Sequence, residues 1–263
     1  MLLVANVGNE NISFGFFESK EYTLISSFKI ACDLKKTSDE YLAVIGAISA
    51  AKGIGVENIE GAIISSVVPQ LTNKIKDTLY AFSGQTPLIV GPGVKTGFLI
   101  KIDNPSELGG DMVANTAAAI RIKKAGKAAI IADIGAVCTV SAISKNGEYL
   151  GCSIFPGVQI SLEALHGRTA QLPNVNASST SRAIGKNSQE AICSGVLFGN
   201  AITLDGIVDR FISEIKCKTD EVQLFATGEY ADVVLSKCKH SFDTDEYLTL
   251  KGLYYIYKNT IKE

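Results

Sequence analysis

The sequence predicts an α/β fold made of two similar halves, each a mixed sheet flanked by helices. Apolar runs of strand length alternate with segments of helical spacing after an opening group of three strands. The strand–turn–strand pattern at the start of the chain returns about 127 residues later, which indicates a duplication. Of the 263 residues, 46% are apolar, enough to build a substantial core.

The first half opens with three extended runs, at residues 2–6, 12–18 and 22–30, and turn residues separate them. This pattern predicts an antiparallel meander. Gly8 and Asn9 turn the chain between the first two runs.

A helix follows the meander, with Ser38 or Asp39 as its cap and Gly53 at its end. The pattern then predicts a buried strand that ends at Pro69. The remaining elements of this half are a helix over 70–83, a strand over 87–91 and a helix over 106–124.

The second half repeats the opening plan, in the stretch "AAIIADIGAVCTVSAISKNGEYLGCSIF" that begins at residue 128. It reads as a strand, a glycine turn, a strand, an Asn146-Gly147 turn and a third strand, and "PGVQISLEALHG" then starts a helix. Aligned on the turns, Asn6-Val7-Gly8 stands opposite Asp133-Ile134-Gly135. We therefore expect two domains, at residues 1–115 and 116–263.

Composition favours a small-molecule ligand over a macromolecular one. The 25 Lys and Arg nearly balance the 27 Asp and Glu, so no charge excess indicates a nucleic-acid or membrane partner. The six cysteines form no CxxC pair and no secretory signal is visible, which predicts reduced thiols in a cytoplasmic protein. With two histidines in the chain, we expect no structural zinc site.

The two glycine turns have two interpretations. In one, they face each other across a cleft between the halves, their amides contact the phosphates of a nucleotide, and a carboxylate at the end of each first strand binds the metal. In the other, they are simply tight turns, which are common in any protein.

The segment "DNPSELGGDMVANTAAAI", residues 103–120, is the richest in chemical signals. Asn104-Pro105 favours a turn, and Asp111 follows a glycine pair at the entry to an alanine-rich helix. Its carboxylate either stabilises the helix N-terminus through the dipole or acts as a general base.

This segment resembles the NPxE(V/L)GxD motif of type III pantothenate kinases. Further matches follow in the order of that family: "DIG" at 133–135, "GCSIFPG" at 151–157, "LPNV" at 172–175, "NSQEAICSG" at 187–195, "ATG" at 226–228 and "YLTLKGL" at 247–253. The resemblance runs from residue 1 to about residue 255. It implies two duplicated actin-like (ribonuclease H-like) subdomains, as in the superfamily that joins acetate and sugar kinases, heat-shock chaperone ATPases and actin.

The resemblance also implies an activity, the transfer of the γ-phosphoryl group of ATP to pantothenate with Mg²⁺ and K⁺ or NH₄⁺. Active members of the family are dimers in which the neighbouring subunit completes the pantothenate pocket. Asp111 matches the general base, Asp133 the metal carboxylate, and Gly109, Gly110 and Ser188 the substrate contacts. The positions that match the nucleotide site are Asn6, Gly8, Asn9, Asn11, Gly135, Ala136, Thr139 and Gly228.

Several site positions depart from the family pattern. Asn6 replaces an Asp, so it brings no charge to a Mg²⁺ shell, and Glu10 replaces a Thr and would repel a triphosphate. Met112 replaces an Arg that resembles a partner for the pantothenate carboxylate, and a thioether cannot make that bond. The other altered positions are Ile102, Ala136, Val137, Cys138, Ser141, Cys152 and Glu229.

These departures leave three hypotheses. The chain is a working pantothenate kinase, a subunit of a hetero-oligomer whose paralogous partner supplies the missing site residues, or an inactive regulatory or ligand-sensing paralogue. We favour the second, because the scaffold motifs persist where the contacts to phosphate and substrate are altered. An identical subunit across the interface is the other possible partner, and a different sugar or acid kinase is a weaker possibility.

Overall fold

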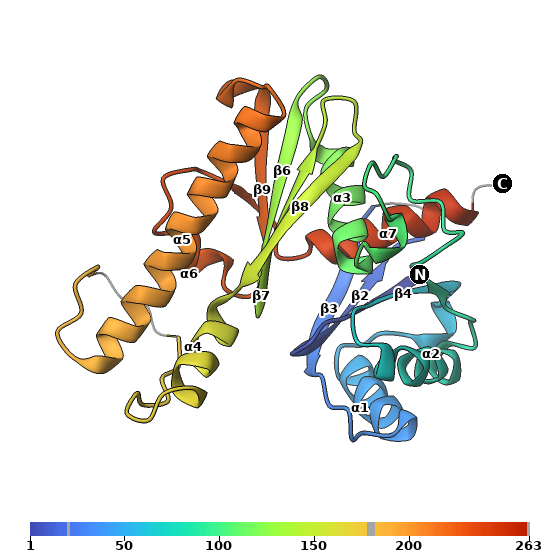
Figure 1. The fold of residues 1–263 in the computed structure, drawn as a ribbon. Helices are drawn as coiled ribbons and strands as arrows, with labels where there is room; N and C mark the ends of the chain where they lie inside the picture. Colours follow the sequence, from blue (N-terminus) through green and yellow to red (C-terminus); the bar gives the residue numbers. More distant parts are fainter. Residues whose placement is uncertain (20–21, 178–181, 262–263) are drawn as a thin grey trace. The chain divides into compact units, whose positions relative to one another are not determined.

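The computed structural model describes residues 1–19, 22–177 and 182–261 (Figure 1). By its contacts the chain divides into two compact units, which are described separately. Unit 1 comprises Met1–Gly97, Asn104–Ala118 and Tyr247–Glu263, and unit 2 comprises Phe98–Asp103 and Ala119–Glu246. The domain limits 1–115 and 116–263, and a cleft between the halves, stay predictions.

Unit 1 contains a five-stranded mixed sheet with the order β3-β2-β1-β4-β5. Strands β1 to β3 form the predicted antiparallel meander, and β4 pairs with β1 in parallel. The strands are β1 (Leu2–Val7), β2 (Asn11–Phe17), β3 (Leu24–Ala31), β4 (Gly61–Ser66) and β5 (Leu88–Ile89).

Helices cover both faces of this sheet. Helices α1 and α2 close one core together with alternate residues of the strands, such as Leu3, Ala5 and Val7. Helix α7 packs on β1, β2 and β4. The helices are α1 (Ser38–Ala51), α2 (Pro69–Ser83), α7 (Leu248–Ile261) and α3 (Gly110–Ile122), of which the residues from Ala119 on belong to unit 2, with short 3₁₀ turns at Val56–Asn58 and Pro105–Glu107.

The cap of α1 differs from the prediction. Thr37, rather than Ser38 or Asp39, precedes the first turn in extended conformation, and its hydroxyl accepts from the Glu40 N–H at 3.2 Å. The Glu40 carboxylate accepts in return from the Thr37 N–H at 2.7 Å. The cap therefore lies one residue earlier, because only Thr37 has a glutamate three residues on to complete this reciprocal pair.

Unit 2 repeats the sheet of unit 1. Its order, read from the far edge, is β8-β7-β6-β9-β10, with an antiparallel β6–β7–β8 meander and parallel pairing of β6 to β9. This equal topology confirms the predicted duplication. The strands are β6 (Ala128–Ile134), β7 (Val137–Ile143), β8 (Tyr149–Pro156), β9 (Val222–Thr227) and β10 (Asp243–Thr244).

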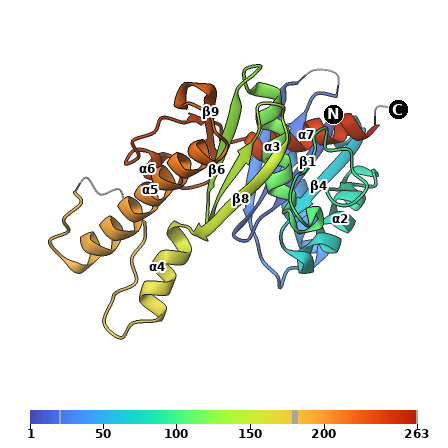
Figure 2. The same ribbon diagram turned by 45° about the horizontal axis from the view of Figure 1, so that its top comes forward.

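One long helix dominates the helical layer of unit 2. Helix α5 (Ser188–Glu214) packs on the sheet, and its N-terminal part lies beside α4 (Val158–Gly167), beyond the end of β8 (Figures 1 and 2). The layer also holds α6 (Ala231–Leu235) and a 3₁₀ turn at Thr219–Glu221. By length and composition α5 could cross a membrane, but just over half of its most apolar window is buried inside the protein, as in a core helix.

Candidate functional site

The predicted phosphate turn in unit 1 is a tight β-hairpin between β1 and β2. The Gly8 N–H donates to the Asn11 carbonyl at 3.0 Å, which closes the turn. Asn9 is exposed at the tip, whereas Glu10 and Asn11 are half-buried.

Backbone hydrogen bonds hold this turn from both flanks. The Val67 N–H, just after β4, donates to the Val7 carbonyl at 3.0 Å. The Cys32 N–H, just after β3, donates to the Glu10 carbonyl at 2.8 Å. The neighbouring strands therefore fix the entry and the exit of the hairpin.

The second predicted turn, between β6 and β7, is held in the same way. Ile134 pairs with Cys138, so this hairpin is one residue shorter than the first, where Val7 pairs with Ile12. The Tyr230 N–H, after β9, donates to the Ile134 carbonyl at 2.9 Å.

On the other flank, the Gly157 N–H, after β8, donates to the Ala136 carbonyl at 2.9 Å. A Cβ at Gly157 would overlap the Gly135 carbonyl oxygen and lie 2.6 Å from that of Ala136. Gly228 has φ +104°, and a Cβ there would lie 2.5 Å from the Ile134 N and O atoms. Only glycine fits these positions, because both approach the backbone of the turn too closely for a side chain.

Asn6 and Ser65 form a polar pair beside the first turn. They are register partners on the parallel strands β1 and β4, so their side chains lie on the same face, opposite the core of α1 and α2. Within the described part of the chain, Asn6 Oδ1 and Ser65 Oγ are buried and have no hydrogen-bond partner. Buried unpaired polar atoms are costly, so this pair fits a hydrogen-bonding group of a ligand or of the water shell of a metal.

The Asp111 carboxylate lies in the first turn of α3, as predicted. Its Oδ1 accepts from the Met112 N–H at 2.8 Å. A Cβ at Gly109 would lie 2.6 Å from this Oδ1, and one at Gly110 would lie 2.7 Å from Ser65 Oγ. The glycine pair therefore leaves room for the carboxylate and brings the start of α3 against β4.

Burial raises the pKa of the Asp111 carboxyl, and hydrogen bonds from the backbone N–H groups of Met112 and Asp111 partly offset this effect. A carboxylate with a raised pKa is a stronger base than an exposed one. The position is therefore chemically suited to accept a proton from an alcohol.

Asp133 is the only predicted metal ligand, and the described residues contain no group of three His, Cys, Asp or Glu that could hold a metal ion. It lies at the end of β6, opposite Thr139 on β7 and Thr227 on β9. A single carboxylate fits a Mg²⁺ ion that takes its other ligands from nucleotide phosphates and water.

Ser188, the remaining predicted substrate contact, is the first residue of α5 and is exposed. Asn187 caps the helix by accepting from the Glu190 N–H at 2.9 Å. Ser188 therefore lies at a well-formed helix start.

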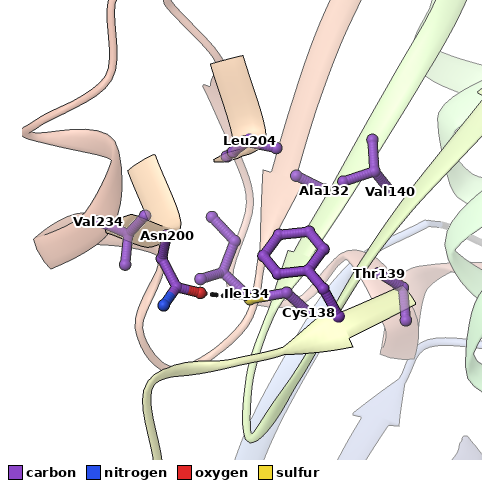
Figure 3. A pocket seen from close by; sticks show the side chains of 9 residues that line it. Ala132, Ile134, Cys138, Thr139, Val140, Asn200, Leu204 and Val234 are labelled. Carbon is purple, nitrogen blue, oxygen red and sulfur yellow. Dashed lines mark hydrogen bonds between the residues drawn. The ribbon is translucent and has the colours of Figure 1, made fainter. Parts of the chain in front are cut away.

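Cys138, next to the second turn, is buried behind the sheet. Its thiol donates to Asn200 Oδ1 of α5 at 3.5 Å, among the mainly apolar side chains between the sheet and α5 (Figure 3). Burial, with a smaller effect of the Asp133 charge, raises the Cys138 pKa to about 12. The thiol is neutral near pH 7, which argues against a nucleophilic role.

The structure thus gathers the predicted residues into two groups. In unit 1, Asn6 and the Gly109-Gly110-Asp111 turn meet around Ser65. The group in unit 2 comprises Asp133, Gly135, Ala136, Thr139 and Gly228 at one end of the second sheet.

Sequence reasoning missed Ser65, Gly157 and Tyr230. Gly157 stands in the "FPG" that ends β8, a signal of a tight connection that was available in the sequence. Ser65 and Tyr230 lie in strand and loop sequences that look ordinary. Only their spatial neighbours single them out.

Comparison with known proteins decides the family. The family model described as type III pantothenate kinase matches residues 2–210. The chain belongs to the type III pantothenate kinase family. Curated family members named "Type III pantothenate kinase" are 38% identical in Geotalea uraniireducens, covering 98% of both chains, and 36% identical in Pelobacter propionicus, covering 98% of this chain and 99% of that one.

A solved structure supports the fold of this family member. It is titled a putative 2-dehydro-3-deoxygalactonokinase from Sinorhizobium meliloti, with a TM-score of 0.60, 9% identity and coverage of 100% of this chain and 98% of that one. Together with the two equal sheets, it confirms the predicted fold of two duplicated actin-like subdomains.

Proposed function

We propose that this chain takes part in the ATP-dependent phosphorylation of pantothenate to 4'-phosphopantothenate, the first step of coenzyme A biosynthesis. The observation that carries the proposal is family membership over residues 2–210 together with a half-buried Asp111 at the start of α3. The glycine pair leaves the space that this carboxylate occupies.

In this proposal Asp111 accepts the proton of the pantothenate hydroxyl as the hydroxyl attacks the γ-phosphorus of ATP. The amide hydrogen bond from Met112 holds the carboxylate in place. Most of the catalytic effect in phosphoryl transfer comes from positioning and from stabilising charge on the phosphoryl oxygens.

The two hairpin turns would hold the phosphates of ATP, with Asp133 facing the cation. Mg²⁺ supplies neutralising charge to the phosphate oxygens, and K⁺ or NH₄⁺ is the monovalent ion implied by the family. Asn6 adds no charge at the first turn, and Glu10 brings a negative one. These residues weaken the nucleotide site of the isolated chain.

We therefore propose that the chain acts in the cytoplasm as one subunit of a hetero-oligomer with a paralogue that supplies the missing residues. Met112 supports this, because it is 8% exposed and packs as a core residue where the family pattern has an arginine. The exposed Ser188 at the start of α5 is available to reach the site of a neighbouring subunit.

The test is a kinase assay on the purified chain with ATP, Mg²⁺, K⁺ and pantothenate, with and without the paralogue from the same genome. We expect weak or no turnover by the chain alone and turnover by the pair that exceeds that of the paralogue alone. Asp111→Asn in this chain and the equivalent change in the paralogue then assign the working base. Full turnover by the isolated chain, or no gain from the pair, would contradict the hetero-oligomer.

The alternative is a catalytically inactive paralogue that senses a ligand. The apolar packing of Met112 and the exposed Glu229 in the "ATGE" loop favour it, since both alter the family's ligand contacts. Calorimetric titration with pantothenate, coenzyme A and ATP separates the two. Binding of a coenzyme A metabolite without phosphorylation in any subunit combination supports the sensor.

A further inference from the structure

The two segments that flank the second hairpin turn are also joined to each other. Gly157 and Tyr230 lie on opposite sides of the turn and each donates a backbone N–H to it. The Tyr230 hydroxyl donates to Oε1 of Gln159 at 3.2 Å, across 71 residues of sequence. This bond closes a ring around the turn that runs through the first turn of α4 and the loop before α6.

A second hydrogen bond orients the amide of Gln159. Its Nε2 donates to Glu163 Oε1, one turn later on α4, at 2.7 Å. The amide must then present its oxygen to Tyr230, because the nitrogen is engaged by the carboxylate. The hydrogen bonds therefore all point the same way, with Tyr230 donating to Gln159 and Gln159 donating to Glu163.

Unit 1 offers a natural contrast. The residues that donate to the first turn from the same places are Cys32 and Val67. Val67 has no polar side-chain atom, and the segments after β3 and β4 are joined further from the turn, where Lys74 Nζ donates to the Leu34 and Lys36 carbonyls at 2.9 and 3.1 Å. A side-chain bond made by the residue that itself donates to the turn is therefore a feature of the second hairpin and not of the first.

We propose that Tyr230 and Gln159 are positioning residues, which fix the separation of the two flanks and so set the shape of the second turn for the phosphate of a nucleotide. Neither the bond nor this role follows from the family motifs. The Gly157 and Tyr230 N–H groups bond the Ala136 and Ile134 carbonyls, and Gly157 and Gly228 lie against the backbone of the turn. A shift of either flank would therefore also shift these carbonyls. The effect on nucleotide affinity rests on the proposed function, whereas the effect on the turn does not.

The first measurement is hydrogen–deuterium exchange of the free chain. Tyr230→Phe removes only the hydroxyl. We expect the N–H groups of Gly157 and residue 230 to exchange roughly 5-fold faster, because the loss of one ordinary hydrogen bond makes opening of the turn easier by about that factor. Tyr80→Phe, at an exposed tyrosine of α2, is the matched control and leaves these amides unchanged. Equal exchange in the two variants would overturn the proposal.

The second measurement is binding of the β,γ-methylene analogue of ATP, in the chain or in its complex with the paralogue. Tyr230→Phe and Gln159→Ala should each weaken binding about 5-fold, and the double variant no further, while pantothenate affinity stays the same. Exchanging the two α4 residues, Gln159→Glu with Glu163→Gln, keeps an acceptor for the Tyr230 hydroxyl. This variant should bind the ATP analogue as tightly as the wild type, unlike Gln159→Ala. Additive losses, or no restoration, would overturn the positioning role.

The two measurements separate the two proposals. If the wild-type protein and its complex do not bind the nucleotide, but Tyr230→Phe still speeds exchange at the turn, the proposed function fails and the positioning of the turn stands. If nucleotide binds normally in every variant, the proposed function stands and the role of Tyr230 and Gln159 fails.

Discussion

The two hairpin turns of this chain are held by equivalent hydrogen bonds but tolerate different side chains. In unit 1 the flanking donors are Cys32 and Val67, and a Cβ on Gly8 would lie 3.1 Å from the nearest atom. In unit 2 the flanks are Gly157 and the Gly228 loop, and a Cβ on either would overlap the turn. Within the second turn, Gly135 has more room than Gly8, since a Cβ there would lie 3.6 Å from the nearest atom. The same duplicated topology thus supports one turn with permissive flanks and one turn whose flanks admit only glycine.

Departures from the family pattern occur at both turns. The first turn carries Asn6 and Glu10, and the second carries Ala136, Val137 and Cys138. The glycines that approach the second turn from its flanks are kept. Side chains have therefore changed at positions that leave the backbone of the turns unaltered, so a scaffold can persist while its ligand contacts change.

The largest expected effect concerns the base beside the first turn. Asp111→Asn should reduce turnover roughly 10²–10⁴-fold in whichever assembly is active, because the amide cannot accept the proton. Steady-state assay of the complex measures this. The matched change Asp133→Asn should mainly weaken nucleotide binding. Equal kinetic effects of the two variants would contradict the assignment of the base to unit 1 and of the cation ligand to unit 2.

Asp111→Asn should also raise stability near neutral pH. Burial raises the pKa of this carboxyl in the folded state above its ordinary value of 3.8. At a pH between these two values the unfolded chain binds fewer protons than the folded one, so the free energy of unfolding falls as pH rises through this range. The variant lacks this loss. Urea unfolding at several pH values should show a gain at neutrality that fades toward acid, and a gain independent of pH would contradict the assignment.

The contrast between the turns can be broken by adding one methyl group to each. Gly157→Ala should destabilise the protein by about 2–4 kcal/mol, because its Cβ meets two carbonyl oxygens of the turn. Gly8→Ala, the control in unit 1, should cost less than about 1 kcal/mol. Chemical unfolding of the two variants measures the difference, and equal losses would show that the two turns are equally tolerant.

A smaller effect should follow from restoring the family residues at the first turn. Asn6→Asp with Glu10→Thr should raise affinity for ATP with Mg²⁺ roughly tenfold, about 1.4 kcal/mol, since the cation gains a carboxylate and the phosphates lose a repelling one. Calorimetric titration against the wild type measures it. An unchanged affinity would show that the first turn does not contact phosphate.

The smallest effect distinguishes the cysteines beside the two turns. Burial, and then the nearby Asp33, raises the pKa of Cys32, whereas the pKa of Cys138 rises to about 12. With iodoacetamide at about pH 8, the exposed Cys152 should react first, Cys32 slowly and Cys138 last. Peptide mapping over time gives the order, and early labelling of Cys138 would show that the second turn opens readily.

Much of the fold was predictable because local patterns carry it. The meander at residues 2–30, the turns at Gly8 and Gly147 and the helix after Asp111 all follow from strand alternation, turn residues and helix signals. The cap of α1 was misplaced by one residue, since Thr37, Ser38 and Asp39 are all good caps and only the reciprocal bond with Glu40 separates them.

The candidate site was predictable in part. Asp111, Asp133 and the two turns were found from motifs, and the structure places each at the end of a strand or the start of a helix. Ser65 could not be found in this way, because its importance comes from its register with Asn6 and the approach of Gly110. Tyr230 and Gln159 were likewise beyond reach, since 71 residues separate the partners.

The sequence by itself determined the family, the duplicated fold class and the chemical departures at the two turns, because these depend on residue identity and on local periodicity. The tertiary structure alone decided which flanks of the turns tolerate a side chain and which side chains support them. Those properties depend on how closely distant backbone segments approach, as Gly157 and Gly228 approach Ile134–Ala136. Such distances arise only when β8 and β9 take their places beside β6 and β7.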